Sequence, residues 1–125
     1  MIQDRPPSLH GKVVLVVEDQ YLVAKRLIDV LHQEGVVTAG PYGRLDAALA
    51  FVEGGGRAHL AITDLNLAGV IAYPLIDALL HRSVPVIIVT GYDAVSVEAA
   101  YRDLPRCQKP FTRPMLLNML TRSLV

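Results

Sequence analysis

Polar residues that could carry chemistry stand directly after four of the apolar runs in this 125-residue chain: Glu18-Asp19, Thr63-Asp64, Thr90-Gly91 and Lys109-Pro110. Three carboxylates held close together repel one another, so such a group needs a cation. Carboxylate oxygens select a hard metal such as Mg²⁺, with Mn²⁺ as the alternative. A carboxylate beside the metal can attack phosphorus and form an aspartyl phosphate, while a lysine and a hydroxyl face the phosphoryl oxygens.

Each of these pairs, taken alone, also has a purely structural explanation. An acidic pair after a strand favours the positive N-terminus of the next helix, and an aspartate or a Thr-Gly pair suits a turn. A lysine is usually solvated. Four such signals at the ends of four predicted strands are hard to explain by structure alone. Their joint presence favours a phosphoryl-transfer site.

The apolar pattern between these pairs alternates between strands and helices. Continuous β-branched runs such as Val13 to Val17 predict strands buried on both faces, and apolar residues spaced three and four apart predict helices. The expected strands are 13–17, 36–39, 60–62, 86–89 and, more weakly because of its polar residues, 104–108. The expected helices are 23–35, 45–52, 74–80, 112–124 and a weak one at 94–102.

This (βα)₅ order predicts an α/β fold, because short crossovers between buried strands require a parallel sheet with helices on both faces. We expect a doubly wound five-stranded sheet of the flavodoxin-like type, with strand order 2-1-3-4-5. Ligands bind beyond the carboxyl ends of the strands in such sheets, which is where the four polar pairs would meet. Residues 1–11 are expected to form a flexible lead, and 12–125 a single domain.

Composition argues against several classes of partner. Twelve basic and twelve acidic residues cancel, so no overall field attracts nucleic acid or an anionic membrane. The single cysteine, Cys107, excludes an intrachain disulfide, and the four histidines match no metal motif. No apolar run approaches the roughly 20 residues that span a bilayer, and the N-terminus has no apolar signal-peptide core. A cytoplasmic location is therefore expected.

The chain resembles the receiver domains of two-component response regulators over about residues 12–124, in the segments VVLVVED, ITDLNL, VIIVTG and QKPF. The resemblance implies that Asp64 accepts a phosphoryl group from a histidine kinase or a phosphotransfer protein. It implies further roles for Glu18 and Asp19 as Mg²⁺ ligands, Asn66 as a backbone carbonyl ligand, Thr90 and Lys109 at the phosphoryl group, and Pro110 after a cis peptide bond. A receiver signals by binding partner proteins and is not an enzyme.

Three departures from the usual receiver pattern indicate a subfamily. Ala68 replaces a frequent proline, Arg106 replaces the usual switch aromatic, and the helix at 94–102 is weak. These features are similar to those of the FATGUY receivers, whose P-F-x-F-A-T-G-Y pattern is matched here by Pro85 and by Thr90-Gly91-Tyr92. Such receivers commonly stand alone and pair with HWE-type histidine kinases. We expect a switch built from Thr90, Gly91, Tyr92 and 93–103 rather than from Arg106.

Three alternatives remain open at this point. A haloacid-dehalogenase-like small phosphatase also uses an aspartate, Mg²⁺ and a lysine, but Tyr21 stands where its D-x-D motif needs an acid. A receiver-like module that binds partners without phosphorylation would not need Glu18, Asp19, Asp64, Thr90 and Lys109 all present. The chain could also be a receiver excised from a longer protein.

Overall fold

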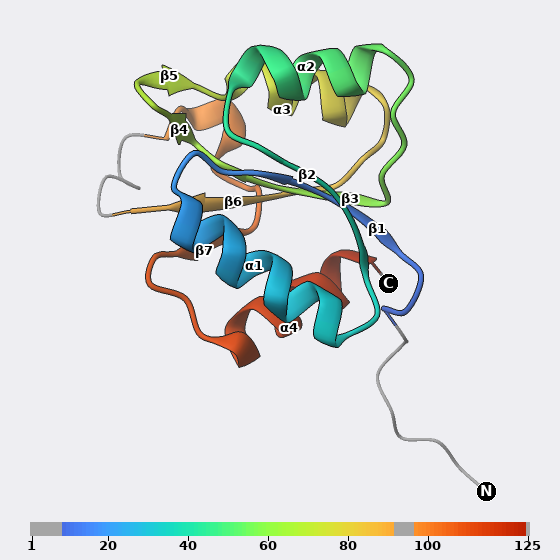
Figure 1. The fold of residues 1–125 in the computed structure, drawn as a ribbon. Coiled ribbons are helices and arrows are strands. Elements are labelled where there is room, and N and C mark those ends of the chain that lie inside the picture. The colour runs from blue at the N-terminus through green and yellow to red at the C-terminus, as the bar shows by residue number, and fades with distance from the viewer. Residues whose placement is uncertain (1–8, 92–96, 125) are drawn as a thin grey trace, which may run out of the picture.

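A computed structural model gives the structure of residues 9–91 and 97–124. Its main feature is a five-stranded parallel sheet in the order β2-β1-β3-β6-β7 (Figure 1). The strands are β1 (Val13–Val17), β2 (Val37–Tyr42), β3 (Leu60–Asp64), β6 (Val86–Thr90) and β7 (Arg106–Gln108). Numbered among these five alone, the order is 2-1-3-4-5, which confirms the predicted doubly wound, flavodoxin-like fold.

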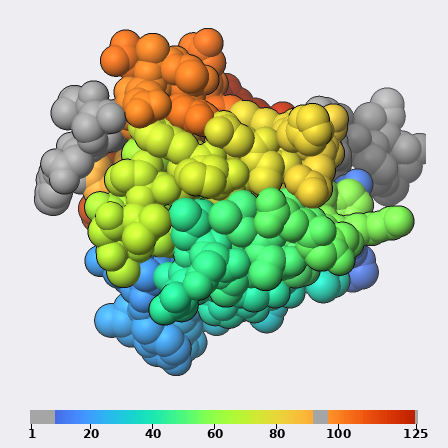
Figure 2. Space-filling view, turned by 90° about the horizontal axis from the view of Figure 1, so that it is seen from above, coloured from blue at the N-terminus to red at the C-terminus, as the bar shows by residue number. Residues whose placement is uncertain are grey.

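Two helices cover each face of this sheet. Helices α1 (Tyr21–Gln33) and α4 (Arg113–Leu124) lie on one face, and α2 (Leu45–Glu53) and α3 (Tyr73–His81) lie on the other (Figure 1). Figure 2 shows α2 in green and α3 in yellow side by side over the second face, with the orange segment that begins after the grey residues next to α3. The molecule therefore has three layers, with a hydrophobic core on each side of the sheet.

The sequence of the strands explains why both faces are covered. Alternate side chains of β1 enter opposite cores: Val14 and Val16 pack towards α1 and α4, and Leu15 and Val17 pack towards α2 and α3. All five residues of β3 and all five of β6 are buried, so these two central strands have no solvent face. Burying one such aliphatic side chain stabilises the fold by about 1.5–3 kcal/mol. These buried strands therefore hold the carboxyl end of the sheet, where the polar residues lie, firmly in place.

A short hairpin follows β3 that the sequence pattern did not predict. Strands β4 (Asn66–Leu67) and β5 (Val70–Ile71) pair antiparallel, directly after Asp64. The two turn residues are Ala68, at φ 52°, and Gly69, at φ 92°. Two successive positive φ angles are typical of a type I′ turn, which matches the twist of paired strands. Strands of two residues are too short to show a period of two, so periodicity could not reveal them.

Other differences lie at element ends. The second strand extends to Tyr42 rather than ending at Ala39, although it contains Gly40 and Pro41. A proline fits there because β2 is an edge strand of the sheet. Within the expected helix at 94–102, the described part holds only a short 3₁₀ helix, η2 (Ala99–Tyr101). Among the described residues, no helix is both long and apolar enough to cross a membrane.

Candidate functional site

The polar residues expected at the strand ends do meet at one edge of the sheet. Glu18 and Asp19 follow β1, and Asp64 closes β3, the strand next to it. One oxygen from each of these three carboxylates lies within 4.8 Å of the other two. Glu18 and Asp64 are buried, and Asp19 is exposed. The register of parallel strands β1 and β3 places the acids together, because their carboxyl ends point the same way.

Lys109 brings a positive charge to this acidic group. Its ammonium nitrogen, Nζ, lies 2.7 Å from Asp64 Oδ2 and 2.9 Å from Glu18 Oε1. It also donates a hydrogen bond of 3.0 Å to the side-chain oxygen of Gln20. The side chain of Lys109 is only 17% exposed, so these interactions are largely shielded from water. One ammonium cannot balance three carboxylates, so the site retains a net negative charge.

The backbone around Lys109 is fixed on both sides. The Lys109 N–H donates to the Thr90 carbonyl at 2.7 Å, and the Lys109–Pro110 peptide bond is cis. Beyond the proline, the Phe111 carbonyl accepts a 3.0 Å hydrogen bond from the Arg26 guanidinium, which also lies 5.3 Å from the centre of the Phe111 ring. Contacts from β6 and α1 therefore hold the loop that carries the lysine.

Asp64 is held by its own chain as well as by Lys109. Its Oδ1 accepts a 3.0 Å hydrogen bond from the Asn66 N–H, while Oδ2 faces the lysine. The side-chain oxygen of Asn66 in turn accepts the Gly69 N–H at 2.7 Å, across the β4–β5 turn. The hairpin thus fixes the backbone that follows the aspartate. The role expected for the Asn66 carbonyl, as a metal ligand, stays a prediction.

Burial and charge shift two pKa values in the site. Burial of Glu18 outweighs its hydrogen bond from the Gln20 N–H and its pairing with Lys109, and raises the pKa of this carboxyl from 4.5 to about 7. Burial alone would lower the pKa of Lys109, but its bonds to Asp64 and Glu18 prevail and raise it. Lys109 is therefore charged throughout the physiological range, whereas a cation bound beside Glu18 would favour the ionised form of this carboxyl.

Thr90 contributes a buried hydroxyl that has no hydrogen bond within the described part of the chain. It is 4% exposed at the end of β6, and its Oγ1 has no hydrogen-bond partner among the residues that the structure describes. Leaving such a group unpaired costs roughly 1–3 kcal/mol. The neighbouring threonine at the end of β3, Thr63, is bonded to the Asp64 carbonyl at 2.9 Å. An incoming group with acceptor oxygens would satisfy the Thr90 hydroxyl.

These residues fit the expected Mg²⁺ and phosphoryl group. Mg²⁺ prefers a few carboxylate oxygens and keeps water in its other positions, and the site offers two buried acids beside an exposed one. The remaining negative charge favours a divalent cation. When bound, the metal would neutralise the charge that builds up on a transferring phosphoryl group.

The expected switch residues are described only in part. Gly91 is exposed after β6, and Arg106 is exposed on β7, paired in register with Ile88. Tyr92 and the first part of 93–103 lie outside the described residues. Sequence reasoning missed Gln20 and Arg26, because both are exposed polar residues whose partners lie 89 and 85 residues away. The position of Gln20, next to the acidic pair, was the only signal available.

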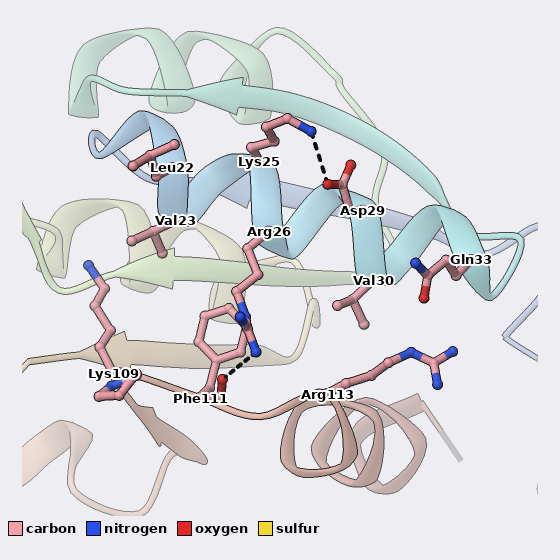
Figure 3. Close-up of a pocket in the computed structure, with 11 residues that line it drawn as sticks. Leu22, Val23, Lys25, Arg26, Asp29, Val30, Gln33, Lys109, Phe111 and Arg113 are labelled. Atoms are coloured by element: carbon pink, nitrogen blue, oxygen red, sulfur yellow. Dashed lines mark hydrogen bonds and ion pairs between the residues drawn. The ribbon is translucent and has the colours of Figure 1, made fainter.

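A groove of about 680 Å³ opens beside the site (Figure 3). It runs between α1 and the loop from Lys109 into α4, and Figure 3 shows Arg26 crossing it to Phe111. Two of its charged groups pair with each other, since Lys25 bonds Asp29 at 3.1 Å, and Arg113 pairs with Glu34 outside the lining. Lys109 lies at one end of the groove (Figure 3).

Comparison with solved structures places the chain among known proteins. It is similar to SdrG from Sphingomonas melonis, at 36% identity and a TM-score of 0.81, over 95% of this chain and 100% of that one. A structure described as the BeF3-activated conformation of SdrG from Pseudomonas melonis is 37% identical, with a TM-score of 0.78 over 93% and 98% of the two chains. A response regulator receiver protein from Sinorhizobium medicae shares the fold, with a TM-score of 0.80 at 16% identity over 94% and 97%. No model of a protein family and no curated protein sequence matches the chain.

Proposed function

The chain belongs to the receiver domains of response regulators, and we propose that it accepts a phosphoryl group on Asp64 in a Mg²⁺-dependent reaction and signals through protein–protein contacts. The single observation that carries this proposal is the pairing of Asp64 with Lys109 at 2.7 Å, beside the buried Glu18 and the exposed Asp19. Asp64 closes the central strand β3, and the Asn66 N–H and Lys109 hold its two carboxylate oxygens, so we take it as the nucleophile.

The arrangement supports a simple phosphoryl transfer. An oxygen of the Asp64 carboxylate forms a bond to phosphorus while the bond from phosphorus to the donor's leaving group breaks. Lys109 balances charge on one phosphoryl oxygen, and the unpaired Thr90 hydroxyl donates to another. Glu18, Asp19, Asp64 and the Asn66 carbonyl would hold the metal. The chemistry is limited to gaining and losing this phosphoryl group, as expected of a signalling domain rather than an enzyme.

The likeness to receiver domains indicates the partners. A sensor histidine kinase, or a phosphotransfer protein, supplies the phosphoryl group, and a target or a further phosphotransfer protein receives the signal. The FATGUY-like residues Pro85, Thr90 and Gly91 favour a kinase of the HWE type, acting in the cytoplasm. The structure of the relative SdrG in a BeF3-activated conformation supports activation through a phosphoryl-like group.

Intact-mass measurement tests the acceptor directly. We expect the protein to gain one phosphoryl group when incubated with Mg²⁺ and a small phosphodonor such as acetyl phosphate. Asp64→Asn should gain none, whereas Asp46→Asn, which removes an exposed aspartate paired with Arg44, should label like the unaltered protein. Removal of Mg²⁺ with a chelator should stop the reaction. Labelling that persists in Asp64→Asn would overturn the assignment.

The haloacid-dehalogenase alternative gains no support from the contacts. Such a phosphatase would use Asp19, which follows the first strand, as its nucleophile. The ammonium of Lys109 instead contacts Asp64 and Glu18, and Asp19 is exposed. The residue two positions after Asp19 is Tyr21, whose side chain is 75% exposed and cannot act as a carboxylic acid.

A further inference from the structure

The side chain of Gln20 forms a hydrogen bond in the site, which neither its residue type nor its exposed position would predict. Its side-chain oxygen accepts a 3.0 Å hydrogen bond from Lys109 Nζ, although the two residues lie 89 positions apart. Its backbone N–H donates to Glu18 Oε2 at 3.0 Å. Gln20 precedes α1 as its N-cap residue, but its side chain makes no capping hydrogen bond. The side chain is therefore available to the lysine rather than to the helix.

The ammonium of Lys109 has three N–H donors and faces three oxygens. These are Asp64 Oδ2 at 2.7 Å, Glu18 Oε1 at 2.9 Å and Gln20 Oε1 at 3.0 Å. A phosphoryl group on Asp64 brings new negatively charged oxygens. The ammonium must direct one of its N–H groups to one of them. The lysine can do so by leaving one of these three contacts, of which those with Asp64 and Gln20 are hydrogen bonds and that with Glu18 is an ion pair.

Gln20 is the partner that the lysine loses at the smallest cost. Its amide oxygen is neutral, whereas Asp64 accepts a hydrogen bond from the ammonium and Glu18 forms an ion pair with it, and hydrogen bonds between charged groups are roughly twice as strong. Gln20 is also exposed, so water can replace the lysine at its oxygen, while Glu18 is 3% exposed and Asp64 7%. Of the lysine's contacts, the Gln20–Lys109 bond is therefore the one most easily exchanged for a phosphoryl oxygen.

We propose that Gln20 is a positioning residue that restrains Lys109 in the unphosphorylated protein and thereby weakens binding of the phosphoryl group. The inference rests on the proposed function, because it takes Asp64 as the acceptor. A bond present only in the initial state stabilises that state, so removing it must favour the phosphoryl-bound state. A stronger acceptor at the same position must do the opposite.

Beryllofluoride with saturating Mg²⁺ is the probe, and its apparent Kd is measured by NMR titration. Gln20→Met keeps the length of the side chain and removes the acceptor, so we expect the Kd to fall about two- to fivefold, as for loss of one hydrogen bond of ordinary strength. Gln20→Glu offers a charged acceptor, so the Kd should rise. Neither substitution touches the backbone bond to Glu18 or removes a helix cap.

The matched controls use Gln108, an exposed glutamine next to Lys109 in sequence. Gln108→Met and Gln108→Glu should change the Kd little, which separates the specific bond from a general effect of charge or bulk. A second readout needs no metal or phosphoryl mimic. Exchange of the Lys109 ammonium protons with water, followed by NMR in the metal-free protein, should be faster in Gln20→Met and slower in Gln20→Glu.

The outcomes distinguish this inference from the proposed function. If the unaltered protein does not bind beryllofluoride, the proposed function fails and the inference fails with it. If it binds but the Kd is the same in Gln20→Met, or if Gln20→Met and Gln108→Met change it equally, only the inference is overturned. Unchanged ammonium exchange in Gln20→Met would also overturn it, because the bond would then be absent in solution.

Discussion

Thr63 and Thr90 are buried at the ends of neighbouring strands, and they differ in whether the side-chain hydroxyl has a hydrogen-bond partner. Thr63 Oγ1 donates to the Asp64 carbonyl at 2.9 Å, whereas Thr90 Oγ1 has no partner among the described residues. Replacing an unpaired hydroxyl with a methyl group of similar shape removes a desolvation penalty, while replacing a paired one breaks a bond. The Thr90 hydroxyl therefore lowers stability and is retained for another purpose.

We expect Thr90→Val to raise the free energy of unfolding of the metal-free protein by about 1 kcal/mol, and Thr63→Val to lower it by about as much. Thr90→Val should also shorten the lifetime of the aspartyl phosphate, because the hydroxyl no longer donates to it. Urea denaturation and the decay of intact-mass labelling measure the two effects. A loss of stability in Thr90→Val would mean that the hydroxyl has a partner in solution.

The raised pKa of Glu18 predicts how the stability of the metal-free protein depends on pH. Its pKa is raised from 4.5 to about 7, chiefly by burial. Between these values the folded protein keeps a proton that the unfolded chain has released, so the free energy of unfolding falls as pH rises through this window. We expect a loss of about 2–3 kcal/mol in urea denaturation between pH 4.5 and 7.

The control for this pH dependence is a pair of substitutions. Glu18→Gln should flatten the profile in that window, whereas Glu53→Gln, at the exposed end of α2, should leave it as it is. Mg²⁺ should also flatten it, because a cation favours the ionised carboxyl. A stability that rises with pH across the window, with Glu18 intact, would contradict the assigned burial effect.

At the scale of elements, the sequence predicted what depends on long apolar patterns and missed what depends on a few residues. The runs at β1 and β6 are continuous and β-branched, so they identify strands buried on both faces. The β4–β5 hairpin has only two residues in each strand, and β2 continues through Gly40 and Pro41, which argue against a strand. Contacts such as Gln20–Lys109 depend on the finished fold, so no local pattern could reveal them.

The β4–β5 turn gives a prediction about an element. Gly69 adopts φ 92°, a conformation that residues with a Cβ rarely take, although no atom lies within 4 Å of the position of a Cβ. We expect Gly69→Ala to lower the free energy of unfolding by about 1–2 kcal/mol through backbone strain alone. Its turn also positions Asn66 after Asp64, so the rate of labelling by acetyl phosphate should fall.

Gly43→Ala serves as the matched control for this turn. Gly43 has no positive φ, and an added Cβ would lie 3.6 Å from the Asp19 backbone, which is an ordinary contact. Its unfolding free energy should change by less than about 0.5 kcal/mol. Equal losses in the two variants would mean that the hairpin turn carries no special strain.

At the scale of the whole molecule, one sheet joins the acidic site to both hydrophobic cores. The central strand β3 ends at Asp64, and its side chains enter the core on each face: Leu60 and Ile62 on one side, Ala61 on the other. A ligand held between the ends of β1 and β3 therefore stabilises the domain as a unit, rather than a local segment. Such a ligand raises the unfolding free energy by RT ln(1 + [L]/Kd).

We expect Mg²⁺ at ten times its Kd to add about 1.4 kcal/mol, which would raise the melting temperature by about 3–8 °C in a domain of this size. Asp19→Asn should raise the melting temperature of the metal-free protein, because it removes one of three mutually repelling carboxylates, and should weaken the response to Mg²⁺. Asp46→Asn, which breaks an exposed pair with Arg44, should keep the full response. Differential scanning calorimetry with and without Mg²⁺ measures both quantities. The melting temperature of the unaltered protein could stay the same when Mg²⁺ is added and yet change with Asp19→Asn. That result would show that the three acids repel one another without forming a metal site.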